Sequence, residues 1–458
     1  MIHAYSLFDT NIVLDIGSGS VHVVDPVAFA AIRQWDAREA LPAQFPEISA
    51  TEWAELFREI EQLIQADKLF APEAAGDTVY AALAAQKRRE RTGEIKALCL
   101  HVAHCCNLDC AYCFARAGQY RGEAALMPFA VGKRALDFLL DSAGDRKHLE
   151  VDFFGGEPLL NWQVVQALVA YARIRERERG KRFRFTLTTN GVLVDDDVIA
   201  FSNREMDNVV LSLDGNRQTH DYFRRFPGEN GSGSYDLILP KLQAFARARE
   251  QAGKSYYMRG TFTHRNPSFL NDLLHMAELG FHALSMEPVV CGQNDPHALT
   301  DADLEHVMRD YEHLALEMQK RRGTSDEFTF YHYMLDLKHG PCLYKRATGC
   351  GAGTEYLAVT PTGELYPCHQ FVGDTQYRMG NVWQGVTNET LREEFSAANL
   401  YTRAECRDCW ARLYCAGGCA ANACHAGAGI NGVYPQGCAL FRKRIECAIW
   451  LQAAASQS

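Results

Sequence analysis

The sequence predicts an α/β protein centred on a parallel sheet of six β-α units, with a small unit before it and a cysteine-rich segment after it. Between residues 95 and 290, apolar strand candidates alternate with helical stretches, which is typical of parallel sheets. Before this region strands are followed by helices, and after Pro341 regular periodicity fades while Cys, Gly and short turns dominate. We therefore expect an open α/β sheet or an incomplete barrel, with chemistry at the carboxyl ends of the strands.

The first unit is predicted to cover residues 1–75, followed by a polar, Ala-rich linker over 76–94. A Gly-Ser-Gly-Ser turn at 17–20 separates two β-type runs and predicts a hairpin. Apolar residues spaced near 3.6 positions apart, behind a helix start at Thr51, predict a helix. The expected elements are strands over 5–15 and 21–24 and helices over 26–35 and 51–67.

The parallel sheet is predicted to cover residues 95–305. Short apolar runs there are separated by longer helical patterns, as β-α units require. The strand candidates are 97–103, 149–154, 184–189, 208–213, 256–263 and 283–289. A charged helical bridge is expected over 306–340, before the cysteine-rich segment 341–458.

Composition narrows the class of protein. A formal net charge of −10 argues against nucleic acid or an anionic membrane as the main partner, because either requires a basic face. No signal-like start and no apolar window long enough for a membrane span are present, so we expect a cytoplasmic protein. Sixteen Cys in a reducing compartment, five of them from Cys99 to Cys113 and ten from Cys342 onward, indicate metal ligands rather than disulfides.

The first cysteine cluster follows the first predicted strand directly. Cys106, Cys110 and Cys113 have the spacing C-x3-C-x2-C. Three thiolates on one short loop can hold three irons of a [4Fe–4S] cube and leave the fourth iron open to a small molecule. A zinc site would need a fourth ligand, which a neighbouring His or Cys could provide. The position of the loop at a strand end favours the iron–sulfur interpretation.

This loop resembles that of the radical S-adenosylmethionine (SAM) superfamily, whose open iron is chelated by the amino and carboxylate groups of SAM. The resemblance implies a partial (β/α)6 TIM-like barrel, with Cys106, Cys110 and Cys113 on the catalytic cluster. Cys105 is an extra thiol whose use would change the spacing, so Cys106 is preferred. Gly-Gly-Glu-Pro and polar strand ends resemble the family's SAM contacts, and the glycines would let the backbone approach closely. The implied SAM-binding residues are Tyr112, Gly155, Gly156, Glu157, Pro158, Thr188, Asn190, Ser212, Asp214 and Arg259.

The cysteines of the tail resemble the SPASM extension of radical SAM peptide maturases, which binds two auxiliary [4Fe–4S] clusters. Their spacing is C-x12-G-x4-C, then C-x2-C-x5-C-x3-C, then a final Cys. The first auxiliary cluster is implied on Cys350, Cys368 and Cys419, completed by Cys342 or by a substrate thiol. The second is implied on Cys406, Cys409, Cys415 and Cys438. Two zinc ribbons are the alternative, and the remaining thiols, Cys99, Cys291, Cys424 and Cys447, are interpreted as ordinary buried or helix residues.

The whole chain resembles maturases of peptides with six cysteines in forty-five residues, the ranthipeptide (SCIFF) maturases. The stretches that carry this resemblance include 11–15, 19–25, 101–104, 351–356 and 366–370. It implies thioether formation, through a 5′-deoxyadenosyl radical, between Cys sulfur and carbon in a Cys-rich precursor peptide with a leader. The first unit resembles a winged-helix RiPP recognition element, whose strand edge pairs with the leader.

The resemblance also implies a flavodoxin- or ferredoxin-type electron donor. Three alternatives remain open at this stage: a carbon–carbon cross-linking enzyme, a formylglycine-forming enzyme, or a non-catalytic iron–sulfur or zinc protein that binds a peptide. The Gly-Gly-Glu-Pro segment at 155–158 favours catalysis over the last of these.

Overall fold

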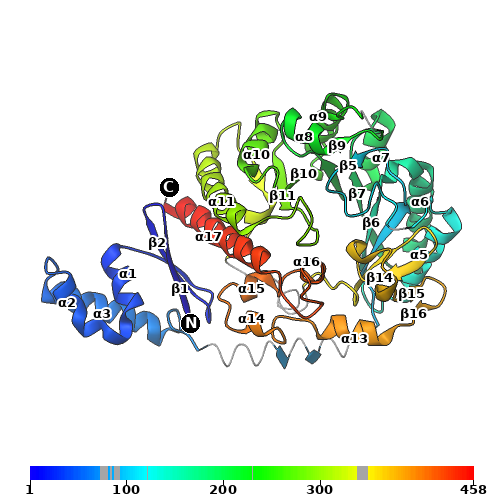
Figure 1. Ribbon diagram of the computed structural model, residues 1–458. Coiled ribbons are helices and arrows are strands. Elements are labelled where there is room, and N and C mark those ends of the chain that lie inside the picture. Colours follow the sequence, from blue (N-terminus) through cyan, green and yellow to red (C-terminus); the bar gives the residue numbers. More distant parts are fainter. Residues whose placement is uncertain are drawn as a thin grey trace.

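The computed structural model describes residues 1–72, 81–82, 85–86, 93–120, 122–228, 231–337 and 349–457. Strands and covering helices form a wide arc, a long C-terminal helix lies near the arc's open side, and a small N-terminal unit stands at one end (Figure 1). The predicted linker over 76–94 and bridge over 306–340 lie only partly within the described ranges, so these domain boundaries stay predictions.

The N-terminal unit is a three-stranded antiparallel sheet covered by helices. Its strands, β1 (Ile2–Leu7), β2 (Thr10–Asp15) and β3 (Val21–Val24), pair in chain order, and its helices are α1 (Pro26–Arg33), η1 (Trp35–Ala40), α2 (Leu41–Gln44) and α3 (Ala50–Gln65). The single strand expected over 5–15 was wrong, because the chain reverses at Phe8, where φ is +53°. Asp9 is a turn former, but Phe8 is a bulky residue that rarely adopts a positive φ, so the sequence carries only a weak signal for the reversal. The helix expected from Thr51 begins at Ala50, because Ser49 is the N-cap and forms a reciprocal capping box with Glu52.

The barrel strands agree with the sequence prediction to within two residues. They are β4 (Ala97–Ala103), β6 (His148–Gly155), β7 (Arg182–Thr189), β8 (Asn208–Ser212), β10 (Ser255–Phe262) and β11 (Ala283–Pro288). Every neighbouring pair is parallel and the strands lie in chain order. Beyond β11 lies the short β12 (Thr329–Phe330), and within the described ranges the sheet does not close on itself. The fold is therefore an incomplete barrel.

Helices cover the outer face of the arc (Figure 1). They are α5 (Phe129–Asp141), η2 (Pro158–Asn161), α6 (Trp162–Arg179), α7 (Asp196–Glu205), α8 (Arg217–Phe223), α9 (Tyr235–Gln251), α10 (Phe269–Glu278) and α11 (Asp301–Arg321). On β7, Phe183, Phe185 and Leu187 are buried in the main core, whereas Thr186 and Thr188 line a cavity on the other face. The two-residue period of a strand thus delivers polar side chains to the inside of the arc.

The cysteine-rich segment continues the same sheet. β13 (Tyr356–Val359) pairs in parallel with β4, and β14 (Glu364–Tyr366), β15 (Gly380–Asn381) and β16 (Gly385–Val386) follow in antiparallel order, which makes eleven strands. Leu357, Val359 and Leu365 belong to the main hydrophobic core. This part of the tail is therefore held by a shared sheet and core, although regular periodicity fades there in the sequence.

The longest helix in the described part of the chain was not predicted from the sequence. α17 (Pro435–Gln457) packs along α11 and touches β1, after four short helices. Those helices are α13 (Glu389–Ala397), α14 (Ala404–Arg407), α15 (Arg412–Cys415) and α16 (Ala420–His425). Tyr5 Oη donates to the Glu446 carbonyl at 2.9 Å, and His3 Nε2 lies 3.0 Å from the Glu446 carboxylate, so α17 fastens the N-terminal unit to the rest. Among the described residues no helix is long and apolar enough to cross a membrane.

Candidate active site

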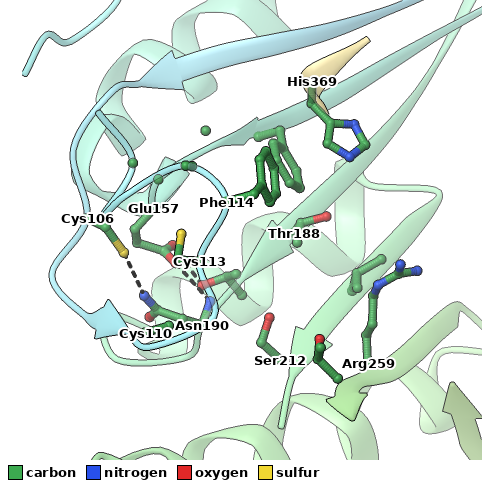
Figure 2. A pocket seen from close by; sticks show the side chains of 18 of the residues that line it. Cys106, Cys110, Cys113, Phe114, Glu157, Thr188, Asn190, Ser212, Arg259 and His369 are labelled. Carbon is green, nitrogen blue, oxygen red and sulfur yellow. Dashed lines mark hydrogen bonds between the residues drawn. The ribbon is translucent and has the colours of Figure 1, made fainter. Parts of the chain in front are cut away.

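A cavity of about 530 Å³ lies on the concave face of the sheet, toward the carboxyl ends of its strands. Figure 2 shows Cys106, Cys110 and Cys113 on one side and Thr188, Ser212 and Arg259 along the strands opposite. The predicted SAM contacts that line the cavity are Tyr112, Gly155, Gly156, Glu157, Pro158, Thr188, Asn190, Ser212 and Arg259. Of the predicted SAM contacts only Asp214 does not line it. The binding roles of these residues stay predictions.

The cysteine loop is held in place around Cys106. The Leu108 N–H donates to Cys106 Sγ at 3.5 Å, and Asn190 Nδ2 donates to the same sulfur at 3.6 Å (Figure 2). Burial raises the pKa of both Cys106 and Cys110 to about 12, so their thiolates need a bound cation. Three clustered thiols with N–H donors aimed at one sulfur are a donor set that fits an iron–sulfur cluster. No three His, Cys, Asp or Glu side chains among the described residues converge as closely as one metal ion requires.

Gly155 and Gly156 bring the end of β6 against this loop. A Cβ atom on Gly155 would lie 2.2 Å from the Ala103 carbonyl oxygen, and one on Gly156 would lie 2.0 Å from that of Cys105. The Glu157 N–H donates to the Cys105 carbonyl at 3.0 Å across the same contact. We expected these glycines to let the backbone approach SAM closely. In the structure they let the end of β6 pack closely against the cysteine loop.

Glu157 is a fixed carboxylate at the cavity wall. It is 1% exposed and accepts hydrogen bonds from the Leu159 N–H at 3.1 Å, Thr189 Oγ1 at 2.8 Å and the Asn190 N–H at 2.8 Å. Burial raises its pKa to about 7 although these donors favour the charged form. Three donors fix the orientation of the carboxylate, which suits it to accept a hydrogen bond from an ammonium group.

Asp214 is the predicted SAM contact that does not line the cavity, and its role stays a prediction. Its side chain is completely buried, and its carboxylate accepts from Tyr112 Oη at 2.6 Å, Arg224 Nε at 2.8 Å, Arg224 Nη2 at 3.0 Å and the Thr261 N–H at 3.0 Å. These bonds use both carboxylate oxygens, which explains why the group does not face the cavity. Tyr112 lines the cavity with its ring while its hydroxyl is engaged by Asp214.

Arg224 is the site residue that the sequence analysis missed most clearly. It begins β9 (Arg224–Arg225), which pairs antiparallel with β5 (Asp109–Cys110) inside the cysteine loop. Its guanidinium joins this short ribbon to Asp214 in a buried ion pair. No spacing motif surrounds Arg224 in the sequence, so nothing there signals its role.

The strand ends opposite the loop present a polar row. Arg259 on β10 is in register with Ser212 on β8, and both side chains face the cavity with Thr188 (Figure 2). Arg259 is exposed, and its guanidinium can bind a carboxylate with two parallel hydrogen bonds. Glu157 and Arg259 thus offer an acceptor for an amino group and a donor set for a carboxylate, the two groups through which SAM would chelate iron.

Further groups that the sequence analysis did not single out line the cavity. Asp152 on β6 has a pKa raised to about 7, mainly by burial and also by the Glu150 charge. His369 follows Cys368 and packs near Phe154, with the ring centroids 5.1 Å apart, and burial lowers its pKa to about 4. The tail of the chain therefore contributes directly to the wall of the barrel cavity.

Glu287, at the end of β11, is a third cavity-lining group that was not predicted. Burial disfavours its charged form, but the adjoining His332, Arg444 and Arg259 lower its pKa to about 2. Since burial also lowers the pKa of His332 to about 3, the arginines supply the positive charge at neutral pH. Arg444 Nη2 lies 3.4 Å from the carboxylate and reaches it from α17.

The tail thiols gather in two sets. Cys406, Cys409, Cys415 and Cys438 line one pocket of about 230 Å³, hereafter the four-cysteine pocket, although Cys438 comes from the first turn of α17. The second set is Cys350, Cys368 and Cys419, hereafter the three-cysteine set. Burial raises the pKa of the Cys368 thiol, and the neighbouring Cys419 and Cys350 raise it further.

Cys419 thus lies with the distant Cys350 and Cys368 rather than in the pocket of its sequence neighbour Cys415. The partition matches the ligand sets that the resemblance implied, while the ligand roles themselves stay predictions. Cys342, the tentative fourth ligand, lies outside the described residues. Cys99 and Cys447 are buried, as expected of ordinary core thiols, but Cys99 also lines the main cavity.

Two family models match separate parts of the chain. Residues 100–252 match the family described as the radical SAM superfamily, and residues 350–410 match SPASM, an iron–sulfur cluster-binding domain. The chain therefore carries a radical SAM domain followed by a SPASM domain. The radical SAM fold binds SAM and a [4Fe–4S] cluster.

The curated relatives are distant in sequence. The radical SAM cyclopropyl synthase TigE of Paramaledivibacter caminithermalis is 25% identical over 203 residues, which are 42% of this chain and 40% of that protein. An uncharacterized protein of Methanocaldococcus jannaschii is 32% identical, over 31% of this chain and 45% of its own. The chain thus matches less than half the length of either. A cysteine-type anaerobic sulfatase-maturating enzyme of Clostridium novyi is 23% identical over 69% of this chain and 85% of its own.

Two solved structures share the fold. Native anSMEcpe with bound AdoMet and Kp18Cys peptide has a TM-score of 0.63 at 20% identity and covers 80% of this chain and 100% of its own. SuiB of Streptococcus suis bound to S-adenosylmethionine has a TM-score of 0.54 at 15% identity and covers 95% of this chain and 98% of its own. At such identities the likeness extends to the fold alone.

Proposed function

We propose that this chain is a radical SAM maturase that forms thioether bonds between Cys sulfur and a carbon atom within a ribosomally made, Cys-rich precursor peptide. One observation carries the proposal: the three-cysteine set adjoins the cavity of the radical SAM domain. Cys368 is followed by His369 and Gln370, which line that cavity, and Cys419 lies within electrostatic reach of the cavity residue Glu287. A peptide thiol and a peptide carbon can therefore meet between the two domains.

The residues of the cavity have distinct tasks in this proposal. Cys106, Cys110 and Cys113 would hold the catalytic cluster, with Glu157 and Arg259 on the amino and carboxylate groups of SAM. When bound, this pair of cofactors supplies a carbon-centred radical that removes a hydrogen atom from the substrate.

The three-cysteine set would orient the substrate sulfur. Three protein thiolates leave one ligand position of a [4Fe–4S] cluster for Cys342 or for a peptide thiol. A peptide sulfur fixed beside the cavity needs little movement to meet a carbon inside it, which lowers the entropic cost of bond formation.

The N-terminal unit would bind the leader of the precursor. In the described part of the chain β3 pairs only with β2, so its other edge is open to an added strand. Peptide substrates are also consistent with the relatives: a subtilosin biosynthesis protein of Bacillus subtilis is 23% identical over 62% of this chain, and SuiB has been solved bound to its precursor peptide SuiA.

Anaerobic reconstitution tests the cofactor part of the proposal. With iron and sulfide, about twelve irons per chain are expected, four for each of three clusters. A chain that takes up zinc and no iron would contradict the assignment. Removal of the loop cluster by Cys113→Ala should leave about eight irons.

Incubation with SAM, a reduced flavodoxin or ferredoxin, and a Cys-rich precursor peptide tests the reaction. Forming a carbon–sulfur bond from C–H and S–H removes two hydrogens: the 5′-deoxyadenosyl radical takes one as a hydrogen atom, and the other leaves as a proton while an auxiliary cluster would accept its electron. The peptide should therefore lose the mass of two hydrogens and one alkylatable thiol per cross-link. Formation of 5′-deoxyadenosine should accompany each turnover. A product that loses two hydrogens but keeps every thiol would indicate a carbon–carbon cross-link and would overturn thioether formation.

Formylglycine formation is the second candidate, favoured by the sulfatase-maturating relative that the alignment covers over 85% of its length. It would convert one Cys or Ser into an aldehyde without joining two residues. An aldehyde-specific hydrazide probe distinguishes the two products, because a thioether does not react with it.

A further inference from the structure

We propose that the floor of the main cavity is a subsite for a cationic side chain of the peptide substrate, a lysine or an arginine, which Asp152 and Asn208 bind. This inference deepens the proposed function, on which it rests for the peptide nature of the substrate. It assigns a partner to a carboxyl group that the SAM contacts do not use.

The floor is a row of polar side chains across three neighbouring parallel strands. Thr186 on β7 is in register with Asp152 on β6 and with Asn208 on β8. All three residues line the cavity that the cysteine loop also lines. Residues in register on adjacent strands point to the same face of a sheet, so these side chains lie next to one another.

This row lies well below the end of the barrel where SAM would bind. Asp152 precedes Gly155, the last residue of β6, by a distance of about 10 Å along the strand. Cys106 and Asp152 line the same cavity, which therefore extends over this depth. A peptide that presents a carbon to the cluster end can reach the floor only with a long side chain.

Two acceptors of the floor lack a donor of matching kind. The Oδ1 atom of Asn208 is buried and has no hydrogen-bond partner among the described residues. Asp152 accepts a hydrogen bond from Thr186, but no Lys, Arg or His within the described ranges forms an ion pair with it. An acceptor in a cavity wall loses its water when a ligand enters, so the ligand has to supply the hydrogen bond.

The groups next to Asp152 do not supply positive charge. Glu150, earlier on the same strand, is exposed and adds negative charge. Cys99 and Tyr356 adjoin Asp152, but burial raises the pKa of each, so both are neutral at neutral pH. The nearest ionisable neighbours thus leave the floor carboxyl group without a counter-ion.

The cations of the inner face are engaged elsewhere. Arg184 is 56% exposed, and its Nε lies 3.8 Å from the carboxylate of Asp207. Arg259 lies on β10 beyond the position in register with Asn208, by about 13 Å along the strand. Its charge acts on Glu287 at the other end of the cavity.

The other carboxylates at the cavity all have partners. Glu157 accepts three hydrogen bonds, and Glu287 is paired with Arg444. The remaining cavity-lining guanidinium group, that of Arg224, is paired with Asp214. Only the carboxyl group of the floor is free to pair with a ligand.

A cationic side chain fits the floor better than a hydroxyl group does. Two acceptors need two hydrogens, which an ammonium or guanidinium group supplies and a hydroxyl does not. Burial raises the pKa of Asp152 to about 7, so the empty floor takes up a proton that a substrate cation would replace. Lysine and arginine also have the long aliphatic stem that the depth of the cavity requires.

Binding of the core of the Cys-rich precursor to the SAM-loaded holoenzyme, without reductant, tests the inference. The leader is removed so that the N-terminal unit does not dominate the affinity, and a fluorescent label on the core gives Kd by anisotropy. Asp152→Asn keeps the shape of the side chain but removes its charge, and it should raise Kd at least about tenfold. Asn208→Leu removes the second acceptor and should raise Kd as well.

Glu150→Gln is the matched control. It removes the same charge from the same strand, but from an exposed residue that does not line the cavity. It should change Kd less than about twofold, because water screens an exposed charge. Iron analysis of each variant shows whether its clusters are intact.

Variants of the peptide identify the side chain that occupies the floor. Each Lys and Arg of the core is replaced by Gln in turn, and one replacement should raise Kd as much as Asp152→Asn does. On the Asp152→Asn chain the same replacement should add almost nothing, because both changes remove one interaction. The residue replaced shows whether the cation is an ammonium or a guanidinium group.

Equal effects of Asp152→Asn and Glu150→Gln, or a core in which no Lys or Arg couples to Asp152, would overturn the inference. Coupling to an uncharged residue of the core would overturn it too. A core that binds with the expected coupling but gains no thioether would remove the proposed function alone. Thioether formation without this coupling would remove only the inference.

Discussion

The cysteine loop of the barrel and the cysteines of the tail are both proposed to bind iron–sulfur clusters, but their thiols are brought together in different ways. Cys106, Cys110 and Cys113 lie within one loop, which Asn190 at the end of β7 and Arg224 on the short strand β9 support. The four-cysteine pocket instead needs Cys438 from the start of α17. A loop site is built by local spacing on a rigid sheet, whereas the tail sites exist only after distant segments have packed.

Cys113→Ala should have the largest effect, because it removes a ligand from the only cluster proposed to bind SAM. We expect 5′-deoxyadenosine formation to fall to background while the iron of the tail, about eight atoms per chain, is retained. Cys105→Ala is the matched control, since Cys105 belongs to the same loop but does not line the cavity. If Cys105→Ala lost the cluster and Cys113→Ala did not, the ligand set would have to be changed.

Cys438→Ala tests the tail side of the comparison. It should remove about four irons and lower the melting temperature, because a metal site that joins two segments also stabilises their packing. Cleavage of SAM without peptide should continue, since Cys438 is far from the cysteine loop in the sequence and lines a different pocket. Iron analysis and calorimetry measure both effects, and full iron retention would show that Cys438 is no ligand.

Arg224→Met should destabilise the barrel side by about 3–5 kcal/mol, because it leaves the buried Asp214 carboxylate without its ion-pair partner. Urea unfolding of the chain before cluster reconstitution gives this free energy. The double variant Arg224→Met with Asp214→Leu should recover much of the loss, since no unpaired charge remains. A loss below about 1 kcal/mol in the single variant would show that the pair contributes little.

Asp152 should make the free energy of unfolding depend on pH, with a smaller effect than the Arg224→Met substitution. Its pKa of about 7 in the folded chain exceeds its ordinary value of 3.8, so the folded state holds a proton that the unfolded state has released. The free energy of unfolding should therefore fall as pH rises from about 4 to 7, by a few kcal/mol at most, and change little above that. Asp152→Asn should flatten this part of the profile, and an unchanged profile would mean that Asp152 is ionised when folded.

Much of the fold could be read from the sequence, because each barrel strand is a short apolar run between helical patterns. The three thiol sets also follow from spacing joined to a family resemblance. The turn at Phe8 was missed, since a bulky residue with positive φ is rare and Asp9 alone is a weak turn signal. α17 was missed because its buried residues make contacts on several sides and leave no single apolar stripe.

By itself the sequence determined which chemistry is available: three thiols at the end of a first strand, a Gly-Gly-Glu-Pro segment after the second, and two further sets of cysteines. Spacing and strand ends are local properties that a chain carries before it folds. Only the tertiary structure decided that β13 joins the barrel sheet, that Cys419 leaves its neighbours, and that Asp214 pairs with Arg224 instead of facing the cavity. Each of these outcomes is a contact between residues far apart in the chain. It therefore depends on tertiary packing and not on the local sequence.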